Sequence, residues 1–237
     1  MKLSGPIVAA MIFALPLITG LPSSGAADQY QDGAGAYAAR DYARALRFWR
    51  PLGDQGHRGA QYNLGVLYAN GQGVVRDQAR AVNWYRKSAK QGYVNAQYNL
   101  GLSYYHGEGV PQSYAKALKW FRAAAAAGQG YAGAEYNIGV MYSQGQGVET
   151  NQIEAVKWLR MAAAQGYASA QFNLGIKYKY GHGVPRDPAE AVNWFRKAAR
   201  LGNAYAQYNL GFMYFMGQGV AQDYTEAMAW YQPAFPK

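Results

Sequence analysis

The chain contains no cysteine among its 237 residues. This absence excludes disulfide bonds, thiolate metal sites, a cysteine nucleophile and a lipid-modified N-terminal cysteine. Acidic residues are also few, with 13 aspartates and glutamates against 23 lysines and arginines, and the formal net charge is +10. Such a surplus of positive charge favours anionic partners or surfaces.

The one markedly apolar run stands at the N-terminus and is typical of a secretory signal peptide. Lys2 precedes the apolar residues 7–21, and the small residues 24–27 suit a signal peptidase. The run is shorter than the roughly 20 residues that a membrane-spanning helix needs. We therefore expect a signal peptide at residues 1–26, no transmembrane segment after its removal, and a periplasmic or secreted location in bacteria. Export and the absence of a dense basic run argue against a nucleic acid partner.

A single pattern fills most of the remaining chain. It reads Ala-x-Tyr-Asn-Leu-Gly-x-x-Tyr, then a Gly-x-Gly-Val turn and a helical segment centred on tryptophan, and its copies start near residues 60, 96, 134, 170 and 206. The period is 36 residues, stretched once to 38, which indicates stacked supersecondary units. We predict an all-α solenoid of helix pairs over residues 37–237, with a partial copy at its N-terminal end and a linker at residues 27–36.

Each copy is predicted to form two helices, which we call helix A and helix B. In helix A, Ala96, Leu100 and Tyr104 are spaced by four residues and so share one face. The tryptophan of helix B is expected in the core, because a single helix pair cannot bury its own apolar face. A sugar-stacking platform is the functional alternative. The recurrent tryptophans are Trp84, Trp120, Trp158, Trp194 and Trp230.

Glycine and capping residues recur at fixed positions. A glycine inside helix A costs about 1 kcal/mol relative to alanine, so its recurrence predicts a helix contact too close for a methyl group. The paired glycines after helix A indicate turns rather than a phosphate loop, since no strand precedes them. Polar residues before helix B are predicted N-caps, and three have a glutamate three positions later, which predicts a capping box. These N-caps are Asp41, Asp77, Ser113, Asn151, Asp187 and Asp223.

This pattern closely resembles the Sel-one-like repeat (SLR) family of the tetratricopeptide-like superfamily. The resemblance covers about residues 37–231 and rests on Leu-Gly-x-x-Tyr, the Gly-x-Gly-Val turn, the tryptophan and an Ala-Ala-x-x-Gly ending. It implies a right-handed α/α solenoid that binds proteins or peptides, often as an adaptor in signalling or envelope assembly. A cysteine-rich branch of the family is linked with β-lactam binding, and its properties do not carry over to this cysteine-free chain.

Solenoids bind partners along equivalent positions of successive repeats. Helix A repeats an asparagine at one such position, and its amide offers a donor and an acceptor to a peptide backbone. The alternative is that each amide satisfies the loop of a neighbouring repeat. The asparagines are Asn63, Asn99, Asn137, Asn173 and Asn209.

Helix A positions that differ between copies are expected to set specificity. The predicted site gathers in the C-terminal half of this face, and two copies of the chain associating through the last repeat are a further possibility. The residues concerned are Lys177, Lys179 and Tyr180 in the fourth copy, Phe212, Phe215 and Met216 in the fifth, and Tyr105 and His106 in the second.

Arginine recurs on helix B and allows two interpretations. The arginines either form a basic ladder for an anionic polysaccharide or pair locally, with their stems lying over apolar surface. They are Arg50, Arg86, Arg122, Arg160 and Arg196.

Nothing in the sequence indicates catalysis. The histidines His57, His106 and His182 fall in turns or at helix ends, and no pair has a short metal-ligand spacing. The serines stand in no recognisable nucleophile motif. We therefore predict a binding protein with no enzymatic activity, no metal and no cofactor, and a hydrolase is the least favoured alternative.

Overall fold

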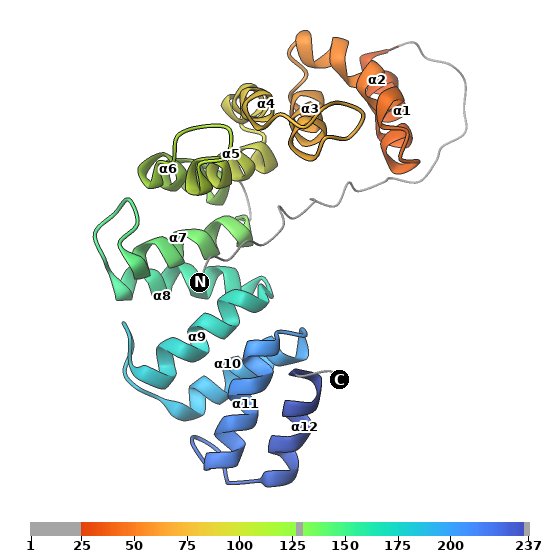
Figure 1. The fold of residues 1–237 in the computed structure, drawn as a ribbon. Helices are drawn as coiled ribbons and strands as arrows, with labels where there is room; N and C mark the ends of the chain where they lie inside the picture. Colours follow the sequence, from red (N-terminus) through yellow and green to blue (C-terminus); the bar gives the residue numbers. More distant parts are fainter. Residues whose placement is uncertain (1–24, 127–129, 235–237) are drawn as a thin grey trace. The chain divides into compact units, whose positions relative to one another are not determined.

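A computed structural model describes residues 25–126 and 130–234. The predicted signal peptide at residues 1–26 therefore lies almost wholly outside the described residues. The described part of the chain forms twelve α-helices and no strand, which confirms the all-α prediction (Figure 1). None of these helices has the length and apolar content of a membrane span.

The helices alternate along the chain as helix A and helix B. Their bounds are α1 (Ala26–Ala38), α2 (Tyr42–Asp54), α3 (Arg58–Asn70), α4 (Gln78–Lys90), α5 (Val94–His106), α6 (Tyr114–Ala125), α7 (Ala132–Gln144), α8 (Gln152–Ala164), α9 (Ala168–Tyr180), α10 (Pro188–Arg200), α11 (Ala204–Met216) and α12 (Tyr224–Ala234). Odd numbers are A helices and even numbers are B helices.

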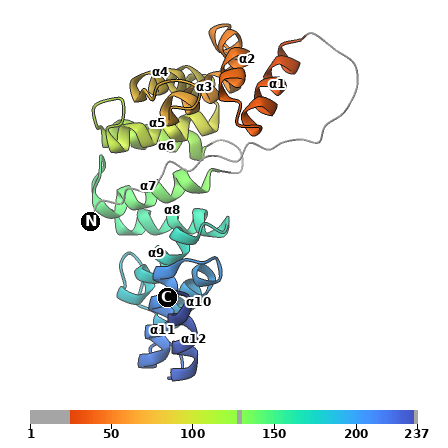
Figure 2. The same ribbon diagram turned by 45° about the vertical axis from the view of Figure 1, so that its right-hand side comes forward.

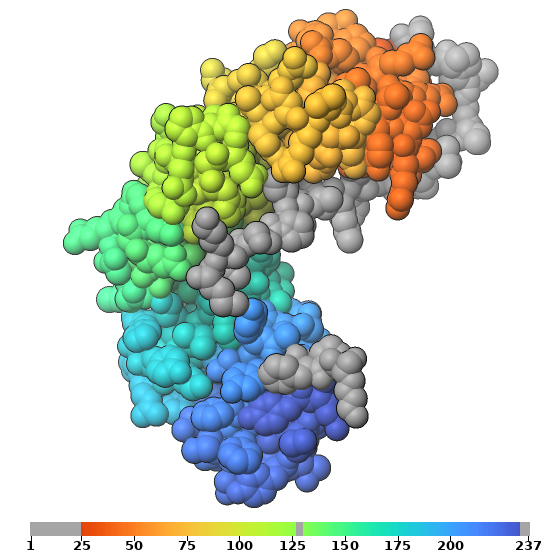
Figure 3. Space-filling view, viewed as in Figure 1, coloured from red at the N-terminus to blue at the C-terminus, as the bar shows by residue number. Residues whose placement is uncertain are grey.

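The chain divides into two compact units. The first unit is residues 1–112 and contains α1 to α5, and the second is residues 113–237 and contains α6 to α12. Within each unit, every helix packs against the next one in sequence (Figures 1 and 2). In the space-filling view, the helices of the second unit lie against one another from green to blue (Figure 3). Each unit is thus a serial stack of helical hairpins.

Helix α1 occupies the segment that the sequence predicts to be a linker at residues 27–36. Its Gly33 lies directly against the indole of Trp49, and the Tyr30 carbonyl accepts a hydrogen bond of 3.1 Å from the indole Nε1. Trp49 is fully buried and Ala36 is also buried. The first hairpin is therefore complete rather than partial, because contacts with α2 stabilise a segment of weak apolar periodicity.

The N-cap predictions are confirmed. For example, the Asp77 carboxylate accepts a hydrogen bond of 2.9 Å from the Arg80 backbone N–H. Helix A ends as predicted at a left-handed glycine, as at Gly181 (φ 76°). The reciprocal half of the capping box differs from the prediction: the Asp187 backbone N–H donates to the Tyr178 carbonyl at 2.9 Å instead of to the glutamate. This bond ties the start of helix B to the preceding helix A.

The glycines inside helix A make the close contacts that their recurrence predicts. A methyl group at Gly175 would overlap the Phe195 ring, and one at Gly139 would lie 2.9 Å from Leu159 Cγ. Phe195 and Leu159 are almost fully buried and directly follow the recurrent tryptophan. The tryptophan itself is partly buried in most copies; Trp194 packs against the core around Leu159. Both the tryptophan, as predicted, and the residue that follows it therefore contribute to the core.

Candidate partner-binding site

The site is built on α9 and α11, two successive A helices of the second unit. Their inward faces carry Leu174 and Gly175 on α9 and Leu210 and Gly211 on α11, all of which are buried. Side chains on the other side of the same helices therefore face away from the core. Helical periodicity thus fixes which variable residues are available to a partner.

A cavity of about 580 Å³ lies on this outer side. Its volume falls within the range of roughly 300–1,000 Å³ that is usual for ligand pockets. The residues that line it are Lys179, Tyr180, Arg186, Tyr208, Asn209, Phe212 and Gln218. Four of these seven were predicted as partner residues from the sequence, and the structure brings them together. We call this cavity the α9/α11 pocket.

Two cations of the α9/α11 pocket are held by neutral groups. Lys179 Nζ donates to Asn209 Oδ1 at 3.3 Å and lies 5.0 Å from the centroid of the Phe212 ring. Arg186 Nε donates to the Lys179 carbonyl at 3.2 Å. None of the ion pairs found among the described residues involves Lys179 or Arg186. The charges of Lys179 and Arg186 are therefore not neutralised by a carboxylate in this part of the chain.

Aromatic side chains border the α9/α11 pocket. Tyr180 is 56% exposed and Tyr208 is 46% exposed. The apolar surface continues along α11, where Phe215 and Met216 are 46% and 48% exposed. The Phe215 ring makes an edge contact with Tyr224, with 5.3 Å between the ring centroids. Phe215 and Met216 thus flank the pocket without lining it, and association of two copies through this surface stays a prediction.

Lys177 does not belong to this surface, and its predicted partner role is wrong. Its side chain is 7% exposed, and Nζ donates to Ser143 Oγ at 2.6 Å and to Gln152 Oε1. Burial lowers the pKa of Lys177 from its usual value, since it disfavours the charged amine. Lys177 shares the inward face of α9 with Ala170 and Leu174, so a signal for its burial was present in the sequence.

The helix A asparagines divide between two environments. In the first unit, Asn63 and Asn99 are buried, with 5% and 6% exposure. Asn63 Nδ2 donates to the Tyr30 hydroxyl at 3.3 Å, and Asn99 hydrogen-bonds Tyr85. Each of these two amides therefore binds a side chain of the preceding repeat, as the structural alternative expects, but that side chain lies on a helix and not in a loop.

In the second unit the asparagines are half-buried. Asn137 Nδ2 donates to the Gly133 carbonyl at 2.8 Å, and Asn209 Nδ2 donates to the Tyr205 carbonyl at 2.9 Å. Asn173 occupies the equivalent position of α9. Of the five asparagines, Asn209 is the one that lines the α9/α11 pocket.

Tyr105 and His106 lie at the end of α5 in the first unit. Their rings make an edge contact, with 5.0 Å between the centroids, and His106 is exposed. They stay a separate predicted site, because they belong to a different unit from the α9/α11 pocket.

The helix B arginines pair locally. Arg160 donates to the Tyr178 hydroxyl at 2.6 Å, and Arg196 donates to the Tyr214 hydroxyl at 3.0 Å. Each bond joins helix B of one repeat to helix A of the next. This arrangement favours the interpretation that the arginines pair within the chain over a free basic ladder.

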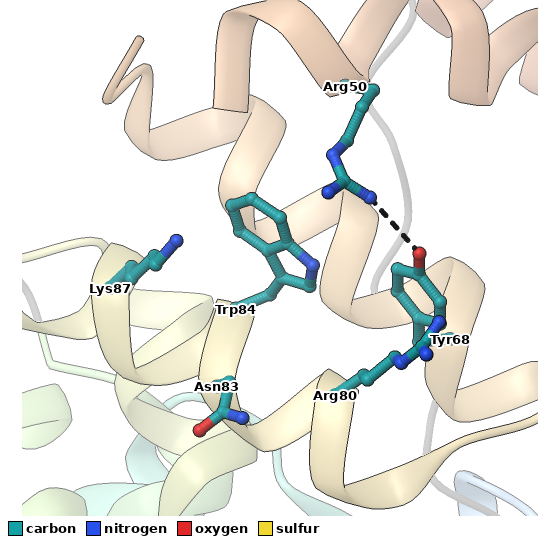
Figure 4. Close-up of a pocket in the computed structure, with 6 residues that line it drawn as sticks. All are labelled: Arg50, Tyr68, Arg80, Asn83, Trp84 and Lys87. Carbon is teal, nitrogen blue, oxygen red and sulfur yellow. Dashed lines mark hydrogen bonds between the residues drawn. The ribbon is translucent and has the colours of Figure 1, made fainter. Parts of the chain in front are cut away.

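Arg50 makes the same contact in the first unit, beside a second cavity of about 370 Å³ (Figure 4). Its guanidinium donates to the Tyr68 hydroxyl at 3.3 Å, and Lys87 Nζ lies 4.2 Å from the centroid of the Trp84 ring. Trp84 is only 7% exposed, so little of its face is open to a sugar ring. The sugar-stacking alternative therefore gains no support at this position.

One buried carboxylate, that of Glu135, was not predicted from the sequence. Glu135 is 1% exposed and stands where the other copies have glutamine, and it accepts a hydrogen bond of 2.7 Å from Gln165 Nε2. Burial raises the pKa of Glu135. No group of three histidine or acidic side chains suited to a metal occurs in the described ranges. Glu135 thus contacts the C-terminal end of α8 through Gln165.

The whole sequence resembles known repeat proteins. It matches the Sel1 repeat six times, at residues 26–57, 59–93, 94–129, 132–167, 168–203 and 204–235. The chain belongs to the Sel1 repeat family. The first match includes α1, in agreement with a complete N-terminal hairpin. Sel1 repeat proteins generally mediate protein–protein interactions and are generally non-enzymatic scaffolds.

Solved Sel1 repeat structures have the same fold. One is a protective antigen with an SLR fold from uropathogenic Escherichia coli, with 37% identity and a TM-score of 0.85 over 89% of this chain. This chain covers only 45% of that protein. A Sel1 repeat protein from Oxalobacter formigenes has 36% identity and a TM-score of 0.82, with 87% of this chain and 82% of that one covered. No curated protein matches the sequence.

Proposed function

We propose that this Sel1 repeat chain is an exported adaptor or scaffold that binds a protein or peptide at the α9/α11 pocket. The observation that carries this proposal is the pocket itself, which combines two cations lacking carboxylate partners with exposed tyrosines. Aromatic and arginine side chains are enriched where proteins bind one another. The family's general role in protein–protein interaction supports the same conclusion.

The apparent signal peptide supports a role in the bacterial envelope, as a structural adaptor or a regulator of signalling. An exported chain meets its partner in the periplasm or outside the cell. Fractionation of cells that express the full chain, compared with a chain lacking residues 1–26, tests this part of the proposal. Equal recovery of both proteins from the cytoplasm would contradict it.

Affinity capture from the envelope fraction, with cross-linking and mass spectrometry, tests the binding role. Tyr208→Ser removes an exposed aromatic side chain of the pocket, and Met228→Ser removes an apolar side chain of similar exposure on α12, outside the pocket. We expect the Tyr208→Ser protein to lose a partner that the wild-type and Met228→Ser proteins recover. Both variants are compared with wild type by circular dichroism, so that loss of capture is not confused with unfolding.

An anionic polysaccharide is the alternative ligand, and it predicts a different result. A polymer held by dispersed charges would be recovered equally by the Tyr208→Ser and Met228→Ser proteins. Recovery of a glycan in both cases would replace the protein-binding proposal.

A further inference from the structure

The α9/α11 pocket has a charge pattern that narrows the chemistry of its partner. Lys179 and Arg186 contribute two positive charges, and the groups that hold them are an amide oxygen and a backbone carbonyl. Asp187 follows Arg186 directly, but its carboxylate accepts from the backbone N–H groups of Ala189 and Glu190. The pocket therefore offers cations that are already oriented and leaves a carboxylate to be supplied by the ligand.

The rings around these cations add a second requirement. Lys179 Nζ lies near the faces of Tyr180 and Phe212, at 5.5 Å and 5.0 Å from their centroids. Tyr208 adds a further exposed ring to the lining. An apolar or aromatic side chain of the ligand would cover these rings, and water would then be excluded from the neighbouring charges. Electrostatic attraction is stronger where water is excluded.

The pair of charges at Lys179 and Arg186 is not repeated in the neighbouring repeats of the second unit, each of which we call a layer. Thirty-six residues before Lys179 and Arg186, the chain has Ser143 and Thr150, and thirty-six residues after them it has Phe215 and Gln222. A long anionic polymer would be held best by charges that repeat from layer to layer. A single charged layer fits a short acidic segment instead.

We infer that the α9/α11 pocket binds a short acidic peptide segment, in which aspartate or glutamate carboxylates flank an aromatic or large apolar side chain. This inference rests on the proposed function and names the class of partner. The carboxylates lie against Lys179 and Arg186, and the apolar side chain lies against Tyr180, Tyr208 and Phe212.

Fluorescence anisotropy with three labelled synthetic peptides tests the inference. The first peptide has glutamates on both sides of a phenylalanine, the second has glutamines in their place, and the third keeps the glutamates but replaces the phenylalanine by alanine. The full mature chain should bind the first peptide at least about tenfold more tightly than either of the others, a factor that corresponds to roughly 1.4 kcal/mol. Its affinity should fall with added salt.

Variants of the chain locate the binding. Lys179→Met and Arg186→Gln should each weaken binding of the first peptide about tenfold, a change in free energy of roughly 1.4 kcal/mol. Lys157→Met is the matched control, because Lys157 is an exposed lysine of α8 outside the pocket. Its affinity for the peptide should equal that of the wild-type chain. Thermal melting of each variant shows whether the fold is kept.

Several outcomes would overturn the inference. They are equal affinity for the glutamate and glutamine peptides, no binding of the glutamate peptide, or unchanged affinity in both Lys179→Met and Arg186→Gln. Binding of polygalacturonate that weakens equally in Lys157→Met and Lys179→Met would point to diffuse attraction of a polymer and would also overturn it.

Capture from the envelope separates this inference from the proposed function. If Tyr208→Ser abolishes capture of a partner while Lys179→Met and Arg186→Gln do not, the pocket binds a protein but not through acidic groups. If all three variants capture the same proteins as wild type, the proposed function fails together with the inference.

Discussion

Lys177 Nζ lies 2.6 Å from Ser143 Oγ, so a buried lysine of α9 is held by a hydroxyl of the preceding A helix. Ser143 also donates to Gln152 Oε1 at 3.2 Å, and Gln152 Nε2 donates to the Ser143 carbonyl at 2.9 Å. Serine and glutamine thus satisfy each other even without the lysine. The buried amine contributes charge where an apolar side chain would also fit, as Met141 and Met213 do at the equivalent positions.

Replacing this lysine by methionine is expected to stabilise the fold. Because burial lowers the folded-state pKa of Lys177, the folded protein binds fewer protons than the unfolded chain between that pKa and 10.5. The destabilisation is complete below the folded pKa and disappears as the pH rises toward 10.5. Lys177→Met should raise the free energy of unfolding at pH 7 by about 1 kcal/mol and reduce its rise with pH.

Urea unfolding at pH 7 and pH 9.5 measures this difference. Lys179→Met is the control, since Lys179 lies on the pocket surface two residues away. Lys179→Met should change peptide binding but not the pH dependence of stability. Lys177→Met should change the pH dependence of stability but not peptide binding. A less stable Lys177→Met protein would show that the amine stabilises its neighbours.

The packing of Gly175 against Phe195 predicts the effect of a single methyl group. Gly175→Ala should lower the free energy of unfolding by about 1–3 kcal/mol, because the added methyl overlaps the Phe195 ring. Gly35→Ala is the control inside α1, where a methyl meets no atom within 4 Å. It should stabilise the protein by up to about 1 kcal/mol through helix propensity. Thermal melts of equal midpoint for the two variants would contradict this account.

Tyr85 predicts part of the response of the protein to alkaline pH. It is 3% exposed, and burial raises its pKa above the ordinary value of 10.0. Its stabilising contribution is therefore present below pH 10 and is lost as the pH rises toward the folded-state pKa. Between these limits, the free energy of unfolding of wild type should fall by about 1 kcal/mol per pH unit more than that of Tyr85→Phe. Parallel unfolding curves of the two proteins from pH 9 to 11 would contradict the assignment.

Glu135 predicts a response at acidic pH. Burial raises the folded-state pKa of Glu135 from 4.5. Its stabilising contribution to the fold is therefore fully present below pH 4.5 and is lost as the pH rises through the folded-state pKa. Glu135→Gln should stabilise the protein at pH 7 by about 1 kcal/mol and have little effect at pH 4. Glu149→Gln, at an exposed position, should have no such effect. An equal gain at both pH values would show that protonation is not the cause.

The sequence predicted the features that depend on local and periodic constraints. The 36-residue period located the hairpins, and glycines such as Gly65 predicted close contacts, one of which the Tyr85 ring makes. The linker prediction at residues 27–36 was wrong because Trp49, a distant residue in the sequence, stabilises α1. Tertiary contacts of this kind leave little trace in local composition.

The candidate site was predicted in part. Lys179 and Phe212 were assigned to the partner surface, and both line the α9/α11 pocket. Lys177 was assigned there too, although two residues on a helix differ by about 200° in direction. Tyr208, Arg186 and Gln218 were not predicted. Arg186 and Gln218 stand in turns whose approach to the helices depends on the stacked arrangement.

The α9/α11 pocket takes its lining from two different repeats, with α10 between them in the sequence. Duplication or deletion of one repeat would consequently bring a new pair of A helices together and create a pocket of different charge. The contacts between glycine and the following helix B lie within single repeats and would survive such recombination. A single gene rearrangement would thus change the binding specificity of this chain and keep the contacts that stabilise each repeat.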